Sequence, residues 1–307
     1  MRRRIAGILA LVACAACALA LEAGEAARES RSLGHRFLCA DFGGNKVCLV
    51  NAKGEIEWEY KTRRPQDVWM LPSGNVLLTC VKAVQEVTRE GTVAWEFKTA
   101  PKNEIHACQP LPDGVVLIAE SGPCRLIEVN RKGEILHEVK LTTKCTRTHG
   151  QMRVARKLAN GHYLVGQYSD RVVREYDPAG KIVWEFAHRN AFGGIRLPDG
   201  NTLIATGDAH RVLEVDRAGK VVWEIAENEL PGNPLRFVAG LQRLANGNTV
   251  ICNWGGHGHV GQQPQIIEVT RDKKIVATLF DNRRFKTISG ICILGEPGDA
   301  TKFGLLR

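Results

Sequence analysis

The chain has 307 residues, of which 44% are hydrophobic and 24% charged, and its formal net charge at neutral pH is +9. This balance is typical of a globular protein and excludes an intrinsically disordered chain. Long runs of Lys or Arg are absent from the sequence, and its aromatic residues lie within apolar segments, so we expect no nucleic-acid partner. A mildly basic chain of this kind is suited to anionic small molecules or polysaccharides.

Residues 1–20 have the pattern of an export signal. Three arginines at positions 2–4 precede the apolar segment IAGILALVACAACALA, and ALA precedes a cleavage site after Ala20. Cleavage removes three arginines and no acid, which lowers the net charge from +9 to +6. A short membrane anchor is the alternative, but the apolar run is below the ~20 residues that comfortably span a bilayer.

The segment LVAC, which ends at Cys14, resembles a bacterial lipoprotein box. Simple cleavage is favoured because the chain stays apolar after this cysteine. We therefore expect an exported protein, periplasmic or extracellular, with lipid anchoring to the cell envelope as the alternative. Membrane attachment is expected only if Cys14 carries a lipid.

From residue 35 onward the chain is built from a repeat of about 40 residues, which indicates a repeat architecture. Five turns of the form Leu-Pro/Ala-x-Gly follow the first strand of each copy, and six turns such as DPAGK or DRAGK precede the last strand. The five turn leucines are spaced by 40, 47, 39 and 47 residues; they are Leu71, Leu111, Leu158, Leu197 and Leu244. Between these turns the segments are short, apolar and rich in β-branched residues, which predicts strands.

Counting the strands predicts the architecture. Five four-stranded sets are complete between Asp67 and Phe280, the N-terminal part has only the last three strands of a set, and residues 287–294 supply one extra first strand. The two incomplete ends complete each other, which predicts an all-β, six-bladed β-propeller with four-stranded blades, closed by a composite blade from both termini. A β-sandwich is the alternative, but it does not explain the complementary ends.

The predicted organisation is a signal peptide over 1–20, a linker over 21–34, the propeller over 35–294 and a tail over 295–307. Positions expected next to the propeller axis are mostly small, so Cys39 and Cys252 are interpreted as core residues rather than reactive thiols. One position of the outermost strand is usually Trp, which predicts packing between neighbouring blades. These tryptophans are Trp58, Trp95, Trp184 and Trp223.

The segment EVDRAGKVVWEI at residues 214–225 resembles the repeat of pyrroloquinoline-quinone-type propellers, and LPDGNTLIATG at 197–207 resembles that of arylsulfotransferase-like propellers. The resemblance covers nearly the whole mature chain at structural positions, and it implies a propeller. Quinoproteins of that kind typically have an adjacent Cys-Cys pair, which this sequence lacks, so quinone binding is not carried over. The sequence identifies no cofactor.

The predicted functional face carries the irregular loops, because binding sites favour variable loops on a rigid scaffold. The opposite face consists of nearly identical turns, whereas six of the nine histidines fall in the irregular loops. The strongest cluster is TRTHGQMRVAR, residues 146–156, which enters the inner strand of the fourth blade.

Four residues near the propeller mouth are the candidate catalytic residues. Arg147 and Arg153 offer forked donors for a carboxylate or sulfate, while His149 and His106 can exchange a proton near neutral pH. The alternative is that the arginines of this cluster form a structural network with Glu120, Asp170 and Asp208. Six further residues are candidate ligand-binding residues: Glu120, Asp208, His210, Trp254, His257 and His259.

The loop NWGGHGH contains Trp254, His257 and His259. The tryptophan can stack on a sugar or aromatic ring, or simply pack the loop. The two histidines could bind a metal if Asp208 or His210 supplied a further ligand, but the sequence fixes no third ligand. We therefore interpret the loop as solvated and assign no metal site.

Cys124 and Cys145 lie in loops of the same face, where a disulfide between them is conceivable in an exported protein. The sequence thus predicts an exported, monomeric propeller that binds an anionic small molecule or carbohydrate at the loop face around its central channel. A lyase, hydrolase or transfer reaction that uses the histidines and arginines would make it an enzyme. The alternative is a non-catalytic scaffold for a protein partner in the cell envelope.

Overall fold

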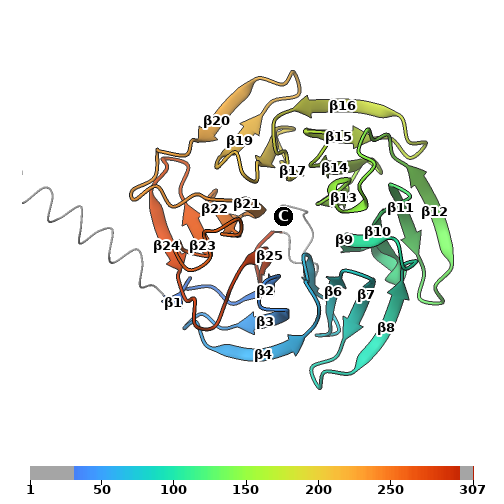
Figure 1. Ribbon diagram of the computed structural model, residues 1–307, viewed down its shortest axis with the longest axis horizontal. Coiled ribbons are helices and arrows are strands. Elements are labelled where there is room, and N and C mark those ends of the chain that lie inside the picture. The colour runs from blue at the N-terminus through green and yellow to red at the C-terminus, as the bar shows by residue number, and fades with distance from the viewer. Residues whose placement is uncertain (1–30, 298–306) are drawn as a thin grey trace, which may run out of the picture.

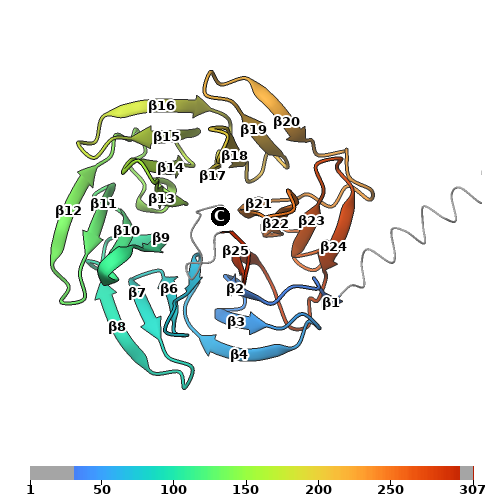
Figure 2. The same ribbon diagram turned by 180° about the vertical axis from the view of Figure 1, so that it is seen from behind.

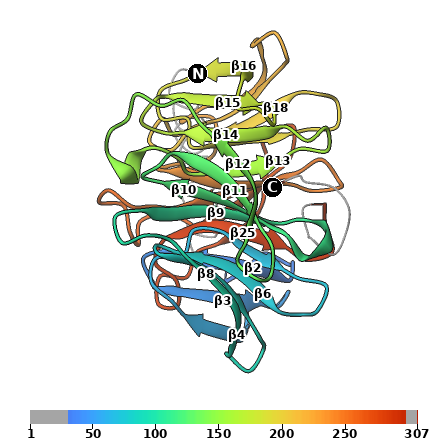
Figure 3. The same ribbon diagram turned by 90° about the vertical axis from the view of Figure 1, so that its right-hand side faces the viewer.

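The computed structural model of the protein describes residues 31–297 and Arg307. In this part of the chain six antiparallel sheets surround a central axis as the blades of a propeller, which confirms the predicted fold class (Figure 1). Figure 3 shows the same ring from its side. The predicted signal segment, Cys14 and most of the 21–34 linker lie outside the described residues, as does most of the 295–307 tail.

Each blade has four strands, the first of which is innermost. Blade 2 contains β5 (Val68–Met70), β6 (Val76–Cys80), β7 (Ala83–Val87) and β8 (Val93–Lys98). Blade 3 contains β9 (Glu104–Pro110), β10 (Val116–Ser121), β11 (Arg125–Val129) and β12 (Ile135–Lys140). Blade 4 contains β13 (Ala155–Lys157), β14 (Tyr163–Gln167), β15 (Val172–Tyr176) and β16 (Ile182–Ala187). Blade 5 contains β17 (Gly193–Arg196), β18 (Thr202–Ala205), β19 (Val212–Val215) and β20 (Val221–Ile225). Blade 6 contains β21 (Val238–Arg243), β22 (Thr249–Asn253), β23 (Ile266–Val269) and β24 (Ile275–Leu279).

Blade 1 is the composite blade, and it closes the ring as predicted. Its outer strands are β2 (Phe37–Asp41), β3 (Lys46–Val50) and β4 (Ile56–Lys61), and its inner strand is β25 (Ile288–Ile293). The last strand pairs antiparallel with β2, and Figure 2 shows the red and blue ends of the chain side by side. In addition, β1 (Arg31–Ser32) pairs with β24, so blade 6 gains a fifth strand that the sequence did not predict.

The outer tryptophans join neighbouring blades, as predicted. The indole Nε1 of Trp184 donates a hydrogen bond of 3.0 Å to the carbonyl oxygen of Arg217 in the next blade. The same bond recurs at three other junctions, from Trp58 to Arg89, from Trp95 to Arg131 and from Trp223 to Arg271. Each of these indoles therefore finds its polar partner in the adjacent blade, which fixes the blades relative to one another.

Small residues are required next to the axis because the inner strands approach closely. A Cβ atom added at Gly166 would lie 2.2 Å from the carbonyl oxygen of Phe192, and one at Gly290 would lie 2.3 Å from that of Gln66. Cys39 and Cys252 are fully buried, as predicted, and burial raises the pKa of both thiols. No disulfide joins any of the eight cysteines of the described chain, Cys124 and Cys145 included.

A search of the described residues finds no helix with the length and apolarity needed to cross a membrane. The two helical segments of the described residues are single 3-10 turns, η1 (Pro112–Gly114) and η2 (Thr148–Gly150). The second lies within the TRTHGQMR loop and carries His149 toward the propeller mouth.

Candidate functional site

A cavity of ≈ 430 Å³ opens at the propeller mouth on the face of the irregular loops. Its lining residues come from strand β25, from loops within blades 1, 4 and 6, and from loops that join neighbouring blades. One of these joining loops, after blade 3, contains the TRTHGQMR segment. The basic side chains of the lining are Arg64, Arg147, Arg153, His149 and His257. The described lining contains no Asp or Glu, so the cavity wall is electropositive.

Arg153 lies at the bottom of this cavity and also lines the narrow channel below it. Its Nη1 atom is enclosed and makes no hydrogen bond, and no carboxylate of the described chain forms an ion pair with it. Burial lowers the pKa of the guanidinium to about 10, which still leaves it charged at neutral pH. The residue as a whole is half-buried, and its guanidinium lies 5.8 Å from the centre of the Tyr168 ring. An enclosed donor without an acceptor is costly.

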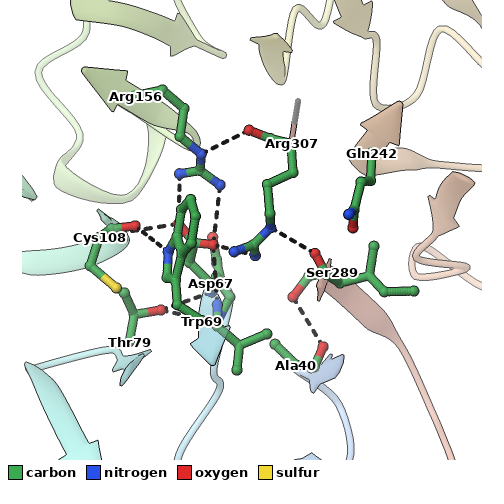
Figure 4. Close-up of polar contacts among 12 residues, drawn as sticks. Ala40, Asp67, Trp69, Thr79, Cys108, Arg156, Gln242, Ser289 and Arg307 are labelled. Atoms are coloured by element: carbon green, nitrogen blue, oxygen red, sulfur yellow. Dashed lines mark hydrogen bonds and ion pairs between the residues drawn. The ribbon is translucent and has the colours of Figure 1, made fainter. Parts of the chain in front are cut away.

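Arg156 follows in the same segment, but its guanidinium is hydrogen-bonded to other parts of the propeller. Its guanidinium contacts the buried carboxylate of Asp67 at 2.7 and 3.1 Å, and Arg307 contacts that carboxylate at 3.1 Å (Figure 4). The ring of Trp69 packs against both guanidinium groups. Arg156 therefore belongs to a structural ion-pair network, as the alternative interpretation of the sequence expected. Its acidic partner, however, is Asp67 and not Glu120, Asp170 or Asp208.

Two of the candidate catalytic residues meet at an acid that the sequence analysis missed. Oε2 of Glu104 lies 2.7 Å from Nδ1 of His149 and 3.0 Å from Nε2 of His106. The contact with His106, and to a smaller extent the contact with His149, lower the pKa of the Glu104 carboxyl to about 2. Burial lowers the pKa of His106 to about 4, so its ring is neutral. The sequence held one signal of this contact: Glu104 lies two residues before His106, and alternate residues of a strand point to the same face.

The opposite wall combines aromatic rings with a second histidine. Nδ1 of His257 lies 2.8 Å from one Asp208 oxygen, and the Tyr168 hydroxyl donates a hydrogen bond of 2.7 Å to the other. Burial and the adjacent Asp208 carboxylate raise the pKa of Tyr168. Trp254 packs against Phe237 and also lines the cavity, so packing of the loop is observed and stacking on a ligand ring stays a prediction. Asp208 itself stands behind this wall and orients the groups that reach it.

Three predicted ligand-binding residues are placed away from the cavity. The Glu120 carboxylate accepts hydrogen bonds from Arg125 at 2.6 Å, Asn103 at 3.1 Å and Thr99, and is therefore part of the blade 3 scaffold. His210 pairs with Glu227 at 2.8 Å, and His259 contacts Gln262 within its own loop at 3.3 Å. The two histidines of the H-x-H pair therefore lie in different surroundings, since His257 lines the cavity and His259 does not.

The fold and this cavity define a six-bladed β-propeller with a cationic, partly aromatic pocket at its mouth. The chain belongs to the Mal s 1 allergenic protein-like family, whose model matches residues 45–274. This match does not support the pyrroloquinoline-quinone-type or arylsulfotransferase-like assignment suggested by the repeats. No curated protein matches the chain.

The solved structures similar to this chain include a protein of unknown function from Bacteroides caccae. It is 32% identical, with a TM-score of 0.77 over 84% of this chain and 98% of that chain. A virginiamycin B lyase from Staphylococcus aureus with quinupristin, described as a catalytically inactive His-to-Ala variant, is 16% identical, with a TM-score of 0.59 over 83% of both chains. A streptogramin B lyase is 13% identical, with a TM-score of 0.58 over 83% of this chain and 87% of that chain. The two lyases share the fold.

Proposed function

We propose that this protein binds an anionic small molecule or an acidic carbohydrate in the mouth cavity. The observation that carries the proposal is Arg153, whose guanidinium faces the cavity with an enclosed Nη1 atom and without a carboxylate partner among the described residues. A sulfate or carboxylate group matches the planar fork of a guanidinium with two parallel hydrogen bonds. Such a group would supply Arg153 with the negative counter-charge that no described side chain provides.

The rest of the lining supports an anion with a ring attached. Arg64 and Arg147 add two positive charges at the mouth, while the described wall carries no acid. The aromatic side chains can stack on a sugar or aromatic ring; they are Phe42, Tyr168, Phe192, Phe237 and Trp254. A cavity of ≈ 430 Å³ also lies within the ~300–1,000 Å³ that small-molecule sites occupy.

An acid–base reaction extends the proposal. The His149 side chain is 57% exposed, faces the cavity and is oriented by Glu104, which is how a carboxylate holds a catalytic imidazole. In a lyase reaction His149 would take a proton from one carbon, the electron pair of that C–H bond would form a C=C bond, and the leaving group would depart from the adjacent carbon with the electrons of its own bond. Arg147 or Arg153 would stabilise the negative charge that develops. The lyases among the similar structures, one of them inactive as a His-to-Ala variant, make elimination the first reaction to test.

The alternative of a protein-binding scaffold predicts an apolar loop face whose arginines are used in salt bridges. Neither Arg147 nor Arg153 takes part in an ion pair with another described residue. Of the eight large exposed hydrophobic residues, seven lie on the outermost strands, far from the mouth. These features favour a small-molecule site.

A thermal-shift screen on the predicted mature chain, which begins after Ala20, tests the proposal. Matched pairs of compounds, such as an aryl sulfate with its phenol and a uronic acid with its neutral sugar, separate the charge from the ring. We expect the charged member of a pair to raise the melting temperature of the parent and to lose this effect in Arg153→Gln. Equal stabilisation of both proteins by every active compound would show that the site is wrong. Hits are then incubated with the parent and His149→Ala, and product formation is followed by NMR.

A further inference from the structure

We propose that Glu104, His106 and His149 form a binding site for a divalent first-row transition-metal cation beside the mouth cavity, with His149 facing this cavity and His106 facing the channel below it. The sequence analysis assigned no metal site, and the proposed anion binding does not require one. Two imidazole nitrogens and one carboxylate are a ligand set that Zn²⁺ and Fe²⁺ use in sites with an open coordination position. Mg²⁺ and Ca²⁺ prefer oxygen ligands, so they are not the expected cations.

The distances within the cluster are close to those of a coordination shell. The three ligand atoms lie within 4.8 Å of one another, and two of the separations, from Oε2 of Glu104 to each imidazole, are 2.7 and 3.0 Å. Around a tetrahedral cation with bonds of ~2.0–2.1 Å, neighbouring ligand atoms are about 3.3 Å apart. Small rotations of the side chains would therefore admit a cation.

His106 supplies an independent observation. It is 2% exposed, yet neither of its ring nitrogens has a hydrogen bond of good geometry to another described residue. Unsatisfied polar atoms inside proteins are uncommon, and a missing ion or water molecule is one of the explanations for them. A cation bound to Nε2 would satisfy one of the two nitrogens and would also explain why the ring approaches Glu104.

The scaffold holds all three ligands firmly. Glu104 and His106 belong to the inner strand β9, which bulges at His106 because Ile105 pairs with Glu120 and Ala107 with Ala119. Bulges of this kind redirect a side chain and are frequent next to active sites.

The loop that carries His149 is anchored on both sides. The amide of Ser169 donates a hydrogen bond of 3.1 Å to the carbonyl oxygen of Gly150. The amide of Gly122 donates one of 2.7 Å to the Gln151 side chain. A metal site benefits from such rigid support, because the ligands lose little entropy on binding.

A bound cation would also complete the anion site. Beside the cluster, Arg153 lines the same channel as His106, and His149 faces the cavity. One carboxylate cannot neutralise a dication, so the open position and Arg153 together would attract a single anionic group. In that state His149 acts as a ligand, and it is no longer free to take a proton.

The test uses tag-free protein that has been stripped with a chelator and then exposed to Zn²⁺ or to Co²⁺. We expect the parent to retain one equivalent of Zn²⁺ after gel filtration and to give the visible absorption of a low-coordinate Co²⁺ site. His149→Ala and Glu104→Gln should bind at least about 10-fold more weakly. His257→Ala is the matched control, because it removes an exposed histidine of the same cavity that lies outside the cluster.

The proposal is overturned if the parent retains neither metal, or if the two ligand variants bind as well as the parent. The proposal is also overturned if His257→Ala is the one variant that loses the metal, because the metal would then be bound outside the cluster of Glu104, His106 and His149. Circular dichroism confirms that each variant is folded. Anion binding is measured separately on the chelated parent and Arg153→Gln, so that a failed metal site and a failed anion site give different results.

Discussion

Arg153 and Arg156 lie three residues apart and enter the same channel, but only Arg156 has a carboxylate partner. Its guanidinium is held by Asp67 at 2.7 Å, while Nη1 of Arg153 is enclosed without a hydrogen bond. The first arginine is therefore available to a ligand and the second belongs to the scaffold. This difference separates predictions about stability from predictions about binding.

Asp67→Asn should strongly destabilise the fold. The substitution leaves Arg156 and Arg307 buried without their shared counter-charge, and breaking a buried ion pair in this way costs about 3–5 kcal/mol. Chemical denaturation measures the free energy of unfolding. Glu185→Gln is the control, since the Glu185 side chain is 53% exposed and its pair with Arg174 should contribute less than about 1 kcal/mol. Similar losses in the two variants would contradict the assignment.

Trp184→Phe should lower the free energy of unfolding by about 1–2 kcal/mol, because it removes the hydrogen bond to Arg217 in the next blade. The phenyl ring retains most of the apolar contact. The exposed Val222→Thr, on the outer strand β20 of the next blade, provides a control for which a change within ~0.5 kcal/mol is expected. If the phenylalanine variant is as stable as the parent, the tryptophans do not hold the blades together.

Glu175→Gln should flatten the dependence of stability on pH in acid. Burial alone would raise the pKa of this carboxyl, but the hydrogen bonds from Arg217 and His162 outweigh it and lower the pKa. A carboxyl whose pKa is lower in the folded state stabilises the fold above its unfolded pKa of about 4.3, and this contribution is lost as the pH falls through the folded pKa. Urea unfolding from about pH 6 down to pH 3 gives the slope. An unchanged slope in the variant would contradict the prediction.

The fold could be predicted from the sequence because the repeat encodes it. The turn leucines and glycines mark every reversal, and the complementary ends require the composite blade that β25 and β2 form. By contrast β1 was not predicted, because a pair of only two residues has no periodicity to detect.

The candidate site was only partly predictable. The loop face and residues such as Arg153 and His149 followed from departures from the repeat, and the structure brings them to one cavity. Glu104 and Asp67 were missed as functional or buried acids, because His149 and Arg156, which contact them, lie far away in the sequence and the repeat carries no information about such contacts. The positions of His210 and His259 were likewise decided by loop neighbours that the pattern does not reveal.

The most direct test of the central claim is an equilibrium titration of the parent and Arg153→Gln with the anion that stabilises the parent best. A charge-assisted hydrogen bond of about 1.5–3 kcal/mol predicts that the dissociation constant rises roughly 10- to 100-fold in this variant. Arg211→Gln, which removes a partly exposed arginine paired with Glu224 outside the cavity, should leave the constant unchanged. Equal dissociation constants for the parent and Arg153→Gln would contradict the account.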